Sequence, residues 1–257
     1  MLLAIDMGNT NIVIGCIQGN KTLFVERVCT DLSKTELEYA ICFKTVLELY
    51  GIKEDEIDGG IISSVVPPLT NIIKEAVEKI IGKDIMVVGP GLKTGLNIQM
   101  DNPKTVGADL VVDAVAAISE YGAPLIIIDM GTATTVSVVD KDRNYIGGMI
   151  IPGIRVSMDS LVNRTSQLPR ISFEAPAKII GTNTVDCMKS GMIVGNAAMI
   201  DGIIDRMEEE LGYKTTVVAT GGLAKSVVSI CKHEIIQDDG LLLKGLSIIY
   251  NKNMDKK

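Results

Sequence analysis

The amino-acid sequence predicts an α/β protein made of two similar halves, each with a mixed sheet flanked by helices. The first observation behind this prediction is a repeat. An apolar segment that ends in Asp6-Met7-Gly8 returns as one that ends in Asp129-Met130-Gly131, and β-rich residues follow both copies. The second observation is the order of elements, because each half opens with three strand-like segments before helices and strands alternate. The predicted domains are residues 1–122 and 123–257.

In the first half, turn and cap signals divide the chain into elements. Ser33 followed by Glu36 is typical of a capping box, and Gly51 is a natural helix end. Pro67-Pro68 suits the start of another helix. The expected strands are a hairpin at 2–14 and the segments 22–28, 60–66 and 85–88, and the expected helices are 33–50, 67–81 and 107–121.

The second half repeats this order. Its polar, proline-containing stretch at 163–182 is expected as a surface loop, and Asp238-Asp239-Gly240 as a turn that starts a helix. Cys187 and Met188 are expected in the core, and residues 253–257 as a solvated tail. The expected strands are 125–129, 134–140, 145–151 and 215–219, and the expected helices are one after Gly153, one over 183–212 and two that finish the chain.

The composition excludes several classes of protein. The 257 residues carry a formal net charge of −7 and a pI near 4.9, which argues against nucleic acid as a partner. The first residues do not resemble a signal peptide, and no apolar run has the length of a membrane span. The five scattered cysteines are typical of reduced core thiols in a cytoplasmic protein. With His233 as the single histidine, a multi-histidine metal site is excluded.

The repeated Asp-Met-Gly turn is the main candidate for binding chemistry. Backbone N–H groups at a glycine turn can hold phosphate oxygens, and the carboxylates of Asp6 and Asp129 can hold a cation that screens them. One copy alone could be an ordinary polar hairpin turn, because Gly and Asn tolerate positive φ. The second copy favours phosphate binding, with a nucleotide held between the two halves.

A third turn, Thr220-Gly221-Gly222, follows an expected strand and precedes an expected helix. Glycines at such a place let the flat ring of an adenosine approach the backbone closely. A plain strand–turn–helix connection explains the two glycines about as well, so both interpretations stay open.

In their order, these three turns resemble those of the superfamily of acetate and sugar kinases, heat-shock chaperones and actin. That resemblance implies duplicated ribonuclease H-like domains, the actin-like ATPase fold. Further motifs extend over essentially the whole chain and resemble one family, type III pantothenate kinase. They are Val106-Gly107-Ala108-Asp109, Gly147-Gly148-Met149-Ile150-Ile151-Pro152-Gly153, Gln167-Leu168-Pro169-Arg170, Thr182-Asn183-Thr184 and Ser190-Gly191. The resemblance implies a cytoplasmic homodimer that uses ATP to phosphorylate pantothenate to 4'-phosphopantothenate, the first step of coenzyme A biosynthesis.

The resemblance also implies a role for each matching position. Asp129 would bind a monovalent cation, K⁺ or NH₄⁺, and Asp109 would be the general base for the pantothenate hydroxyl. The residues that would hold ATP, with Mg²⁺, are Asp6, Met7, Gly8, Asn9, Thr10, Asn11, Ile12, Val13 and, from the second turn, Thr132. The residues that would line the pantothenate pocket, near a dimer interface, are Gly107, Ala108, Asp109, Leu110 and Thr184.

The residues by themselves allow a second interpretation of Asp109. Phosphoryl transfer needs an acceptor for one proton, and a carboxylate at a helix start can serve without a histidine. Asp before Leu110 and Val111 is also what a helix start prefers, and residue chemistry alone favours this capping role. The resemblance favours the general base.

Three positions differ from the family pattern. Leu110 stands where the family usually has arginine, Met100 where many members have tyrosine, and Asp113 where asparagine is frequent. Loss of one charged contact would weaken pantothenate binding or turnover. Two alternatives therefore stay open: a kinase of another small hydroxyl acceptor, and a nucleotide-binding regulatory homologue with impaired catalysis.

Overall fold

The computed structural model describes residues 1–254, and its contacts divide the chain into two compact units. The first unit comprises Met1–Leu96, Asp101–Ala116 and the C-terminal segment that starts at Leu241. The second unit comprises Asn97–Met100 and Ala117–Gly240. Each unit has its own sheet.

The first unit is built on a five-stranded sheet in the order β3-β2-β1-β4-β5. Its strands are β1 (Leu2–Met7), β2 (Asn11–Gln18), β3 (Lys21–Cys29), β4 (Gly59–Ser64) and β5 (Ile85–Val87). Strand β1 pairs antiparallel with β2 and parallel with β4, so the sheet is mixed as predicted. This central position pairs β1 with a neighbouring strand along both of its edges.

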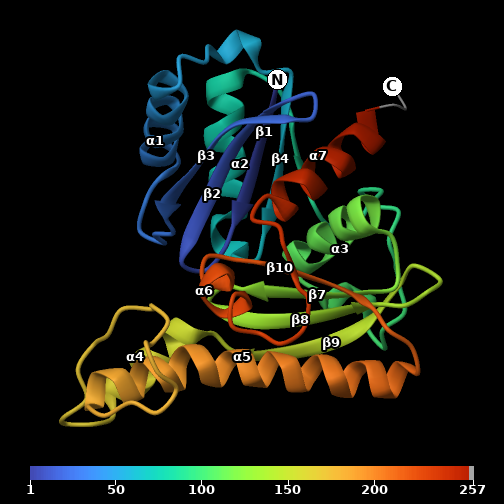
Figure 1. Cartoon of the computed structure of the whole chain (residues 1–257). Coiled ribbons are helices and arrows are strands. Elements are labelled where there is room, and N and C mark those ends of the chain that lie inside the picture. The colour runs from blue at the N-terminus through green and yellow to red at the C-terminus, as the bar shows by residue number, and fades with distance from the viewer. Residues whose placement is uncertain (255–257) are drawn as a thin grey trace. The chain divides into compact units, whose positions relative to one another are not determined.

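Helices cover both faces of this sheet (Figure 1). Helices α1 (Glu36–Leu49) and α2 (Pro67–Ile81) pack on one face, where Leu3, Ile5 and Met7 join their apolar side chains. The opposite face carries α7 (Leu241–Met254) and the first turns of α3 (Ala108–Tyr121), which pack against Leu2 and Ala4. Because side chains alternate along a strand, Asp6 belongs to the α3 and α7 face of β1.

The second unit repeats this plan. Its strands are β7 (Leu125–Met130), β8 (Ala133–Val139), β9 (Asn144–Pro152), β10 (Thr216–Thr220), β11 (Ile236–Gln237) and β6 (Asn97–Ile98), in the order β11-β10-β7-β8-β9-β6. Strand β7 pairs antiparallel with β8 and parallel with β10, as β1 does with β2 and β4. Without β6, the two sheets have one topology, which confirms the duplication expected from the repeated turn.

The helices of the second unit are α4 (Ile154–Asn163), α5 (Thr184–Leu211) and α6 (Ala224–Val228). The long α5 crosses one face of the sheet (Figure 1) and buries Ala197, Ile200 and Ile204 against β7, β8 and β10. As expected, the stretch 164–183 contains neither helix nor strand. Within residues 1–254, no helix combines the length and the apolar character that crossing a membrane requires.

The C-terminal helix belongs to the first unit, although the predicted boundary at 122 and 123 placed it in the second half. Leu246 and Ile249 of α7 are fully buried in the core on that sheet. Gly15 lies so close to Leu243 that a Cβ on the glycine would be 2.6 Å from Leu243 Cδ1. The division into halves 1–122 and 123–257 stays a prediction, since it follows the repeat in the sequence and not these contacts.

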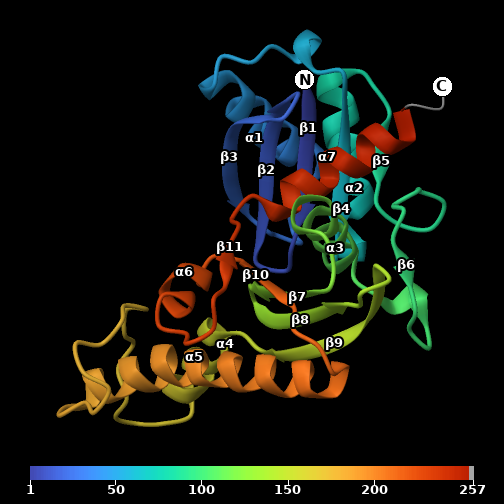
Figure 2. The same cartoon turned by 45° about the vertical axis from the view of Figure 1, so that its right-hand side comes forward.

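Several local predictions were wrong. The capping box of α1 is formed by Thr35 and Glu38, and Ser33 instead donates from both N–H and Oγ to Asp31. Cys187 is exposed, while Met188 is buried as expected. The short strands β6 and β11 (Figure 2) and the 3₁₀ turns η1 (Glu54–Glu56) and η2 (Pro103–Thr105) were not predicted.

The thiols and the C-terminus also differ from expectation. All five cysteines are free, but only Cys16 is fully buried. Asn253, expected in a solvated tail, is in α7 and binds the backbone of Lys93. Its Oδ1 accepts from the N–H of Lys93 at 3.1 Å, and its Nδ2 donates to the carbonyl of Lys93 at 3.0 Å. The rest of that predicted tail, 255–257, lies outside the described residues.

Candidate active site

The first Asp-Met-Gly turn connects β1 to β2 and is closed by its own backbone. The N–H of Gly8 donates to the carbonyl of Asn11 at 3.0 Å. The side chains at the tip are exposed, and they belong to Asn9, Thr10 and Asn11. Amide and hydroxyl groups are therefore accessible beside a glycine turn, which suits phosphate oxygens.

Not every residue predicted to bind the nucleotide in this turn has a side chain that a ligand can reach. Met7 and Ile12 have no exposed surface and belong to the core against α1 and α2. Only their backbone groups can reach a ligand. Asp6 and Val13 are half-buried and face each other across the β1–β2 pair.

The second turn, between β7 and β8, is one residue shorter and is also closed by a hydrogen bond from its glycine. The N–H of Gly131 donates to the carbonyl of Ala133 at 3.0 Å, and the side chain of Thr132 is exposed. Asp129 is half-buried at the end of β7, paired with Thr135 of β8 and Thr220 of β10. The fold therefore brings Asp129 and Thr132 together on one turn, as the sequence indicated.

Gly221 packs directly on this second turn. Its φ is +98°, a left-handed conformation that favours glycine. A Cβ at this position would lie 2.6 Å from Oδ1 of Asp129 and 2.6 Å from both N and C of Met130. The close approach of β10 to β7 thus accounts for a glycine at 221, whereas an adenosine contact there stays a prediction.

Asp109 is the second residue of α3 and is not its N-cap. Its Oδ1 accepts a hydrogen bond of 2.8 Å from the N–H of Leu110. Burial raises the pKa of this carboxyl group, although its hydrogen bonds to backbone N–H groups act in the opposite direction. A carboxylate that binds a proton more readily than usual is suited to accept one in a reaction.

Gly107 makes room for this carboxylate, because a Cβ on Gly107 would be 2.3 Å from Oδ1 of Asp109. Ala108 packs on the core formed by α7 and the first sheet, and one turn later Val112 is fully buried there. Leu110 is half-buried, and Met100 has 37% of its surface exposed. The motif 107–110 is thus anchored through Ala108, with the Asp109 carboxylate folded back toward Gly107.

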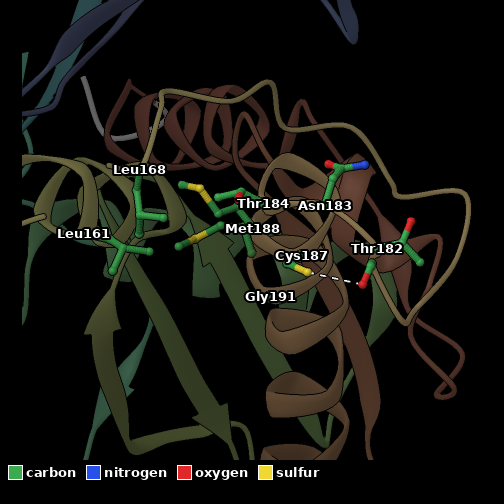
Figure 3. Close-up of a pocket in the computed structure, with 10 residues that line it drawn as sticks. Leu161, Leu168, Thr182, Asn183, Thr184, Cys187, Met188 and Gly191 are labelled. Carbon is green, nitrogen blue, oxygen red and sulfur yellow. Dashed lines mark hydrogen bonds between the residues drawn. The ribbon is translucent and has the colours of Figure 1, made fainter. Parts of the chain in front are cut away.

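Thr184 lies elsewhere, at the first turn of α5, and lines a cavity of about 550 Å³ (Figure 3). Its apolar walls include Leu161, Leu168 and Met188, and its polar wall includes Thr182 and Asn183. The N-cap Asn183 accepts from the N–H of Asp186 at 2.9 Å, which fixes the start of the helix.

The loop that precedes α5 forms one side of this cavity, through Gly181 and Thr182. Cys187 Sγ donates to the carbonyl of Gly181 at 3.3 Å (Figure 3), and Ser190 Oγ donates to that of Ile179 at 2.5 Å. A Cβ on Gly181 would be 2.4 Å from the backbone N of Cys187, so the loop lies against the helix. The cavity can hold a small molecule with both polar and apolar parts.

The turns also carry the donor atoms that hard cations need. Magnesium in phosphate-binding sites uses one or two carboxylates together with phosphate oxygens, so a single aspartate such as Asp6 fits this chemistry. Asp129 offers a carboxylate of the same type for a monovalent cation. Among residues 1–254, no three His, Cys, Asp or Glu side chains are grouped to hold a metal by themselves.

Two hydrogen bonds that hold these turns from outside were not predicted from the sequence, although Gly153 itself belongs to a motif noted there. Thr30 and Gly153 each follow the third strand of a unit and each donate a hydrogen bond to a turn, Thr30 to the first and Gly153 to the second. The sequence signal that could have identified them is their equivalent position in the repeat, directly after the third strand of each unit. The first turn and the motif 107–110 belong to the first unit, whereas Asp129, Thr132 and Thr184 belong to the second.

The duplicated mixed sheets, with a glycine turn after the first strand of each, define the actin-like ATPase fold. Component A of (R)-2-hydroxyglutaryl-CoA dehydratase from Acidaminococcus fermentans has this fold, with a TM-score of 0.58, 14% identity and coverage of 99% of both chains. A Campylobacter jejuni protein provisionally assigned to the Baf family of transcriptional activators has a TM-score of 0.60 at 18% identity, over 98% of this chain and 99% of that one. At such low identities these similarities establish the fold alone.

Sequence comparison assigns the chain more closely. The family model described as type III pantothenate kinase matches residues 2–206. The type III pantothenate kinase of Halalkalibacterium halodurans is 44% identical over 254 residues, which cover 99% of this chain and all of that protein. The chain belongs to the type III pantothenate kinase family, so it is an enzyme of the transferase class. Neither the regulatory alternative nor a different acceptor is favoured by these relatives.

Proposed function

We propose that this protein transfers the γ-phosphoryl group of ATP to the primary hydroxyl of pantothenate, giving 4'-phosphopantothenate, the first step of coenzyme A biosynthesis. The observation that carries the proposal is the 44% identity to a type III pantothenate kinase over 99% of the chain. The Asp109 carboxylate, with its raised pKa, supplies the group that the reaction needs.

Asp109 acts as the general base. As the pantothenate oxygen bonds to the γ-phosphorus, the bond from that phosphorus to the β–γ bridging oxygen breaks and ADP leaves. The hydroxyl proton goes to the Asp109 carboxylate. The hydrogen bond from the N–H of Leu110 to Oδ1 restrains the orientation of this carboxylate.

The nucleotide phosphates are held by the first turn, Asp6 to Val13, with Met7 and Ile12 acting through their backbone because their side chains are buried. Thr132 contacts the nucleotide from the second turn. Asp6 would hold Mg²⁺, and Asp129 would hold a monovalent cation, K⁺ or NH₄⁺. Cations bound there would supply positive charge that screens the phosphates.

Pantothenate is bound by Gly107, Ala108, Asp109 and Leu110, and by Thr184 of the cavity at the start of α5. Pantothenate has a hydroxyl-bearing apolar end, an amide and a carboxylate. The cavity, with Leu161 and Met188 opposite Thr182 and Asn183, offers both kinds of surface.

The protein works as a cytoplasmic homodimer without a nucleic-acid partner. Exposed apolar side chains of the second unit support an interface between copies, among them Ile150, Ile179 and Ile180, which are 78%, 71% and 82% exposed. Sedimentation velocity tests this assembly, and a monomer at micromolar concentration would contradict it.

The function is tested by incubating the protein with ATP, Mg²⁺ and K⁺ and, one at a time, a panel of small hydroxyl acceptors that includes pantothenate. Mass spectrometry identifies any phosphorylated product. We expect phosphorylation of pantothenate at a rate above that of every other acceptor. Product from another acceptor with none from pantothenate would overturn the proposal.

A further inference from the structure

Thr30 makes two hydrogen bonds to the first Asp-Met-Gly turn. Its Oγ1 donates to the carbonyl of Gly8 at 2.6 Å, and its backbone N–H donates to the carbonyl of Thr10 at 3.0 Å. Thr30 directly follows the last residue of β3, which pairs with Asn11 at the start of β2. The end of β3 therefore holds the turn from the side.

In the second unit, the residue directly after the third strand also forms a hydrogen bond to the Asp-Met-Gly turn. Gly153 directly follows the last residue of β9, and its N–H donates to the carbonyl of Thr132 at 3.1 Å. Thr10 and Thr132 each immediately precede the second strand of their unit. The backbone bond is thus common to both copies, whereas the hydroxyl bond to Gly8 exists only where the sequence has threonine. This contrast separates a general feature of the fold from a feature specific to the first turn.

We infer that the hydroxyl of Thr30 is a positioning group for ATP binding, because it fixes the direction of the Asn9 backbone N–H, one of the groups proposed to hold the phosphates. The inference rests on the proposed role of residues 6–13 in holding the phosphates. Thr30 acts through Gly8 and Asn9 and needs no contact with the nucleotide.

The physical reason lies in the geometry of the peptide bond. The carbonyl of Gly8 and the N–H of Asn9 belong to one planar trans peptide, in which they point in opposite directions. A carbonyl held toward Thr30 therefore turns the N–H of Asn9 away from β3. Glycine at position 8 leaves this peptide free to rotate, so a bond that fixes it lowers the cost of ordering the turn around phosphate.

The test compares two substitutions that both keep the backbone N–H of Thr30. Thr30→Val keeps the shape and removes the hydroxyl, and Thr30→Ser keeps the hydroxyl. Thr45→Val is the matched control, since Thr45 Oγ1 also donates to a backbone carbonyl, that of Ile41 at 2.8 Å, but on the exposed side of α1. ATP affinity is measured by calorimetry, the KM for ATP and for pantothenate by assay, and folding by thermal unfolding.

We expect Thr30→Val to weaken ATP binding about 3- to 10-fold, the loss of one ordinary hydrogen bond. Thr30→Ser and Thr45→Val should stay within about twofold of the parent protein, and the KM for pantothenate should not change in any variant. A merely structural role would lower the affinity for both substrates together or leave ATP affinity unchanged. Either result in Thr30→Val, or failure of Thr30→Ser to restore ATP binding, would overturn the inference.

The calorimetric measurement keeps this inference separate from the proposed function. If the parent protein binds ATP but does not phosphorylate pantothenate, the proposed acceptor is wrong, and the Thr30 series is still decided by ATP affinity. If the parent protein phosphorylates pantothenate and Thr30→Val binds ATP normally, the inference fails and the proposed function stands. If ATP does not bind to the parent protein, both the proposed function and the inference about Thr30 are wrong.

Discussion

Oδ1 of Asp109 accepts a hydrogen bond of 2.8 Å from the backbone N–H of Leu110, its neighbour in the first turn of α3. This bond holds the carboxylate beside Gly107, where any larger residue would collide with it. Burial raises the pKa of the same carboxyl group. The hydrogen bond from Leu110 orients the carboxylate, and burial makes it a stronger base. The orientation of the group and its proton affinity can therefore be tested separately.

Asp109→Asn separates these two properties. Asparagine retains an Oδ1 that can accept from Leu110, but it cannot accept a proton from the substrate. We expect kcat to fall about 100-fold or more, while ATP affinity stays within about twofold. Steady-state kinetics and calorimetry provide the two measurements. Equal losses of turnover and of ATP binding would indicate that Asp109 serves the fold instead of the reaction.

Activity should fall on the acid side as Asp109 becomes protonated. Because its pKa is raised, the acid limb of kcat/KM for pantothenate should have its midpoint above 3.8, the usual value for an aspartate. A pH–rate profile measures this midpoint. A limb at or below 3.8 would show that another group controls the reaction.

The raised pKa also predicts the sign of a stability effect. A carboxyl group with a higher pKa in the folded state stabilises the fold when protonated, and this contribution is lost as pH rises through the folded-state pKa. Near pH 7, Asp109→Asn should therefore unfold at the same temperature as the parent protein or higher. A clear decrease in Tm at pH 7 would contradict the burial effect.

Gly221→Ala should disturb the second turn. The new Cβ would lie 2.6 Å from Oδ1 of Asp129, the proposed ligand of the monovalent cation. We expect the K⁺ concentration for half-maximal activity to rise about tenfold, since the carboxylate must move. Titration of activity with KCl at constant ionic strength measures this shift.

Gly91→Ala is the matched control for that substitution. Gly91 has the same φ of +98°, but no atom lies within 4 Å of the position that a Cβ would take. Gly91→Ala therefore introduces the same backbone strain without a steric collision. Its K⁺ dependence should match that of the parent protein. If both variants shift the K⁺ dependence equally, contact between Gly221 and Asp129 is not the cause.

Leu110→Arg together with Met100→Tyr should improve pantothenate binding, because these are the residues that the family pattern usually has at these positions. A charged hydrogen bond to an anionic substrate lowers KM about tenfold or more. The control is Leu37→Arg on α1, an exposed leucine that receives the same charge elsewhere. An unchanged KM for pantothenate in the double variant would mean that these two positions do not determine affinity.

The sequence predicted the elements whose signals are local and repeated. Strands β1 and β7 each end in Asp-Met-Gly, and periodic apolar residues mark helices such as α2 and α3. The start of α1 was misplaced because Ser33/Glu36 and Thr35/Glu38 both fit a capping box. In the structure the hydroxyl of Tyr39 donates to the carbonyl of Asp31 and accepts from its N–H, so the chain is turned before Ser33 and the helix starts at the later pair.

Features that depend on distant pairing could not be predicted. Strand β6 is two residues long and exists because Asn97 and Ile98 pair with Asn144 and Tyr145. Thr30 follows a strand and gives no local sign of its bond to Gly8, 22 residues earlier. In the site, residue types such as Asp6 and Asp109 could be proposed from motifs, whereas the buried side chains of Met7 and Ile12 became evident only in the folded core.

The most direct test of the proposed function is the stoichiometry of one reaction. With ATP, Mg²⁺, K⁺ and limiting pantothenate, ADP and 4'-phosphopantothenate should form in equal amounts, and ADP formation should stop when pantothenate is consumed. Formation of ADP at a rate that does not depend on pantothenate, with no phosphorylated pantothenate in the mixture, would contradict it.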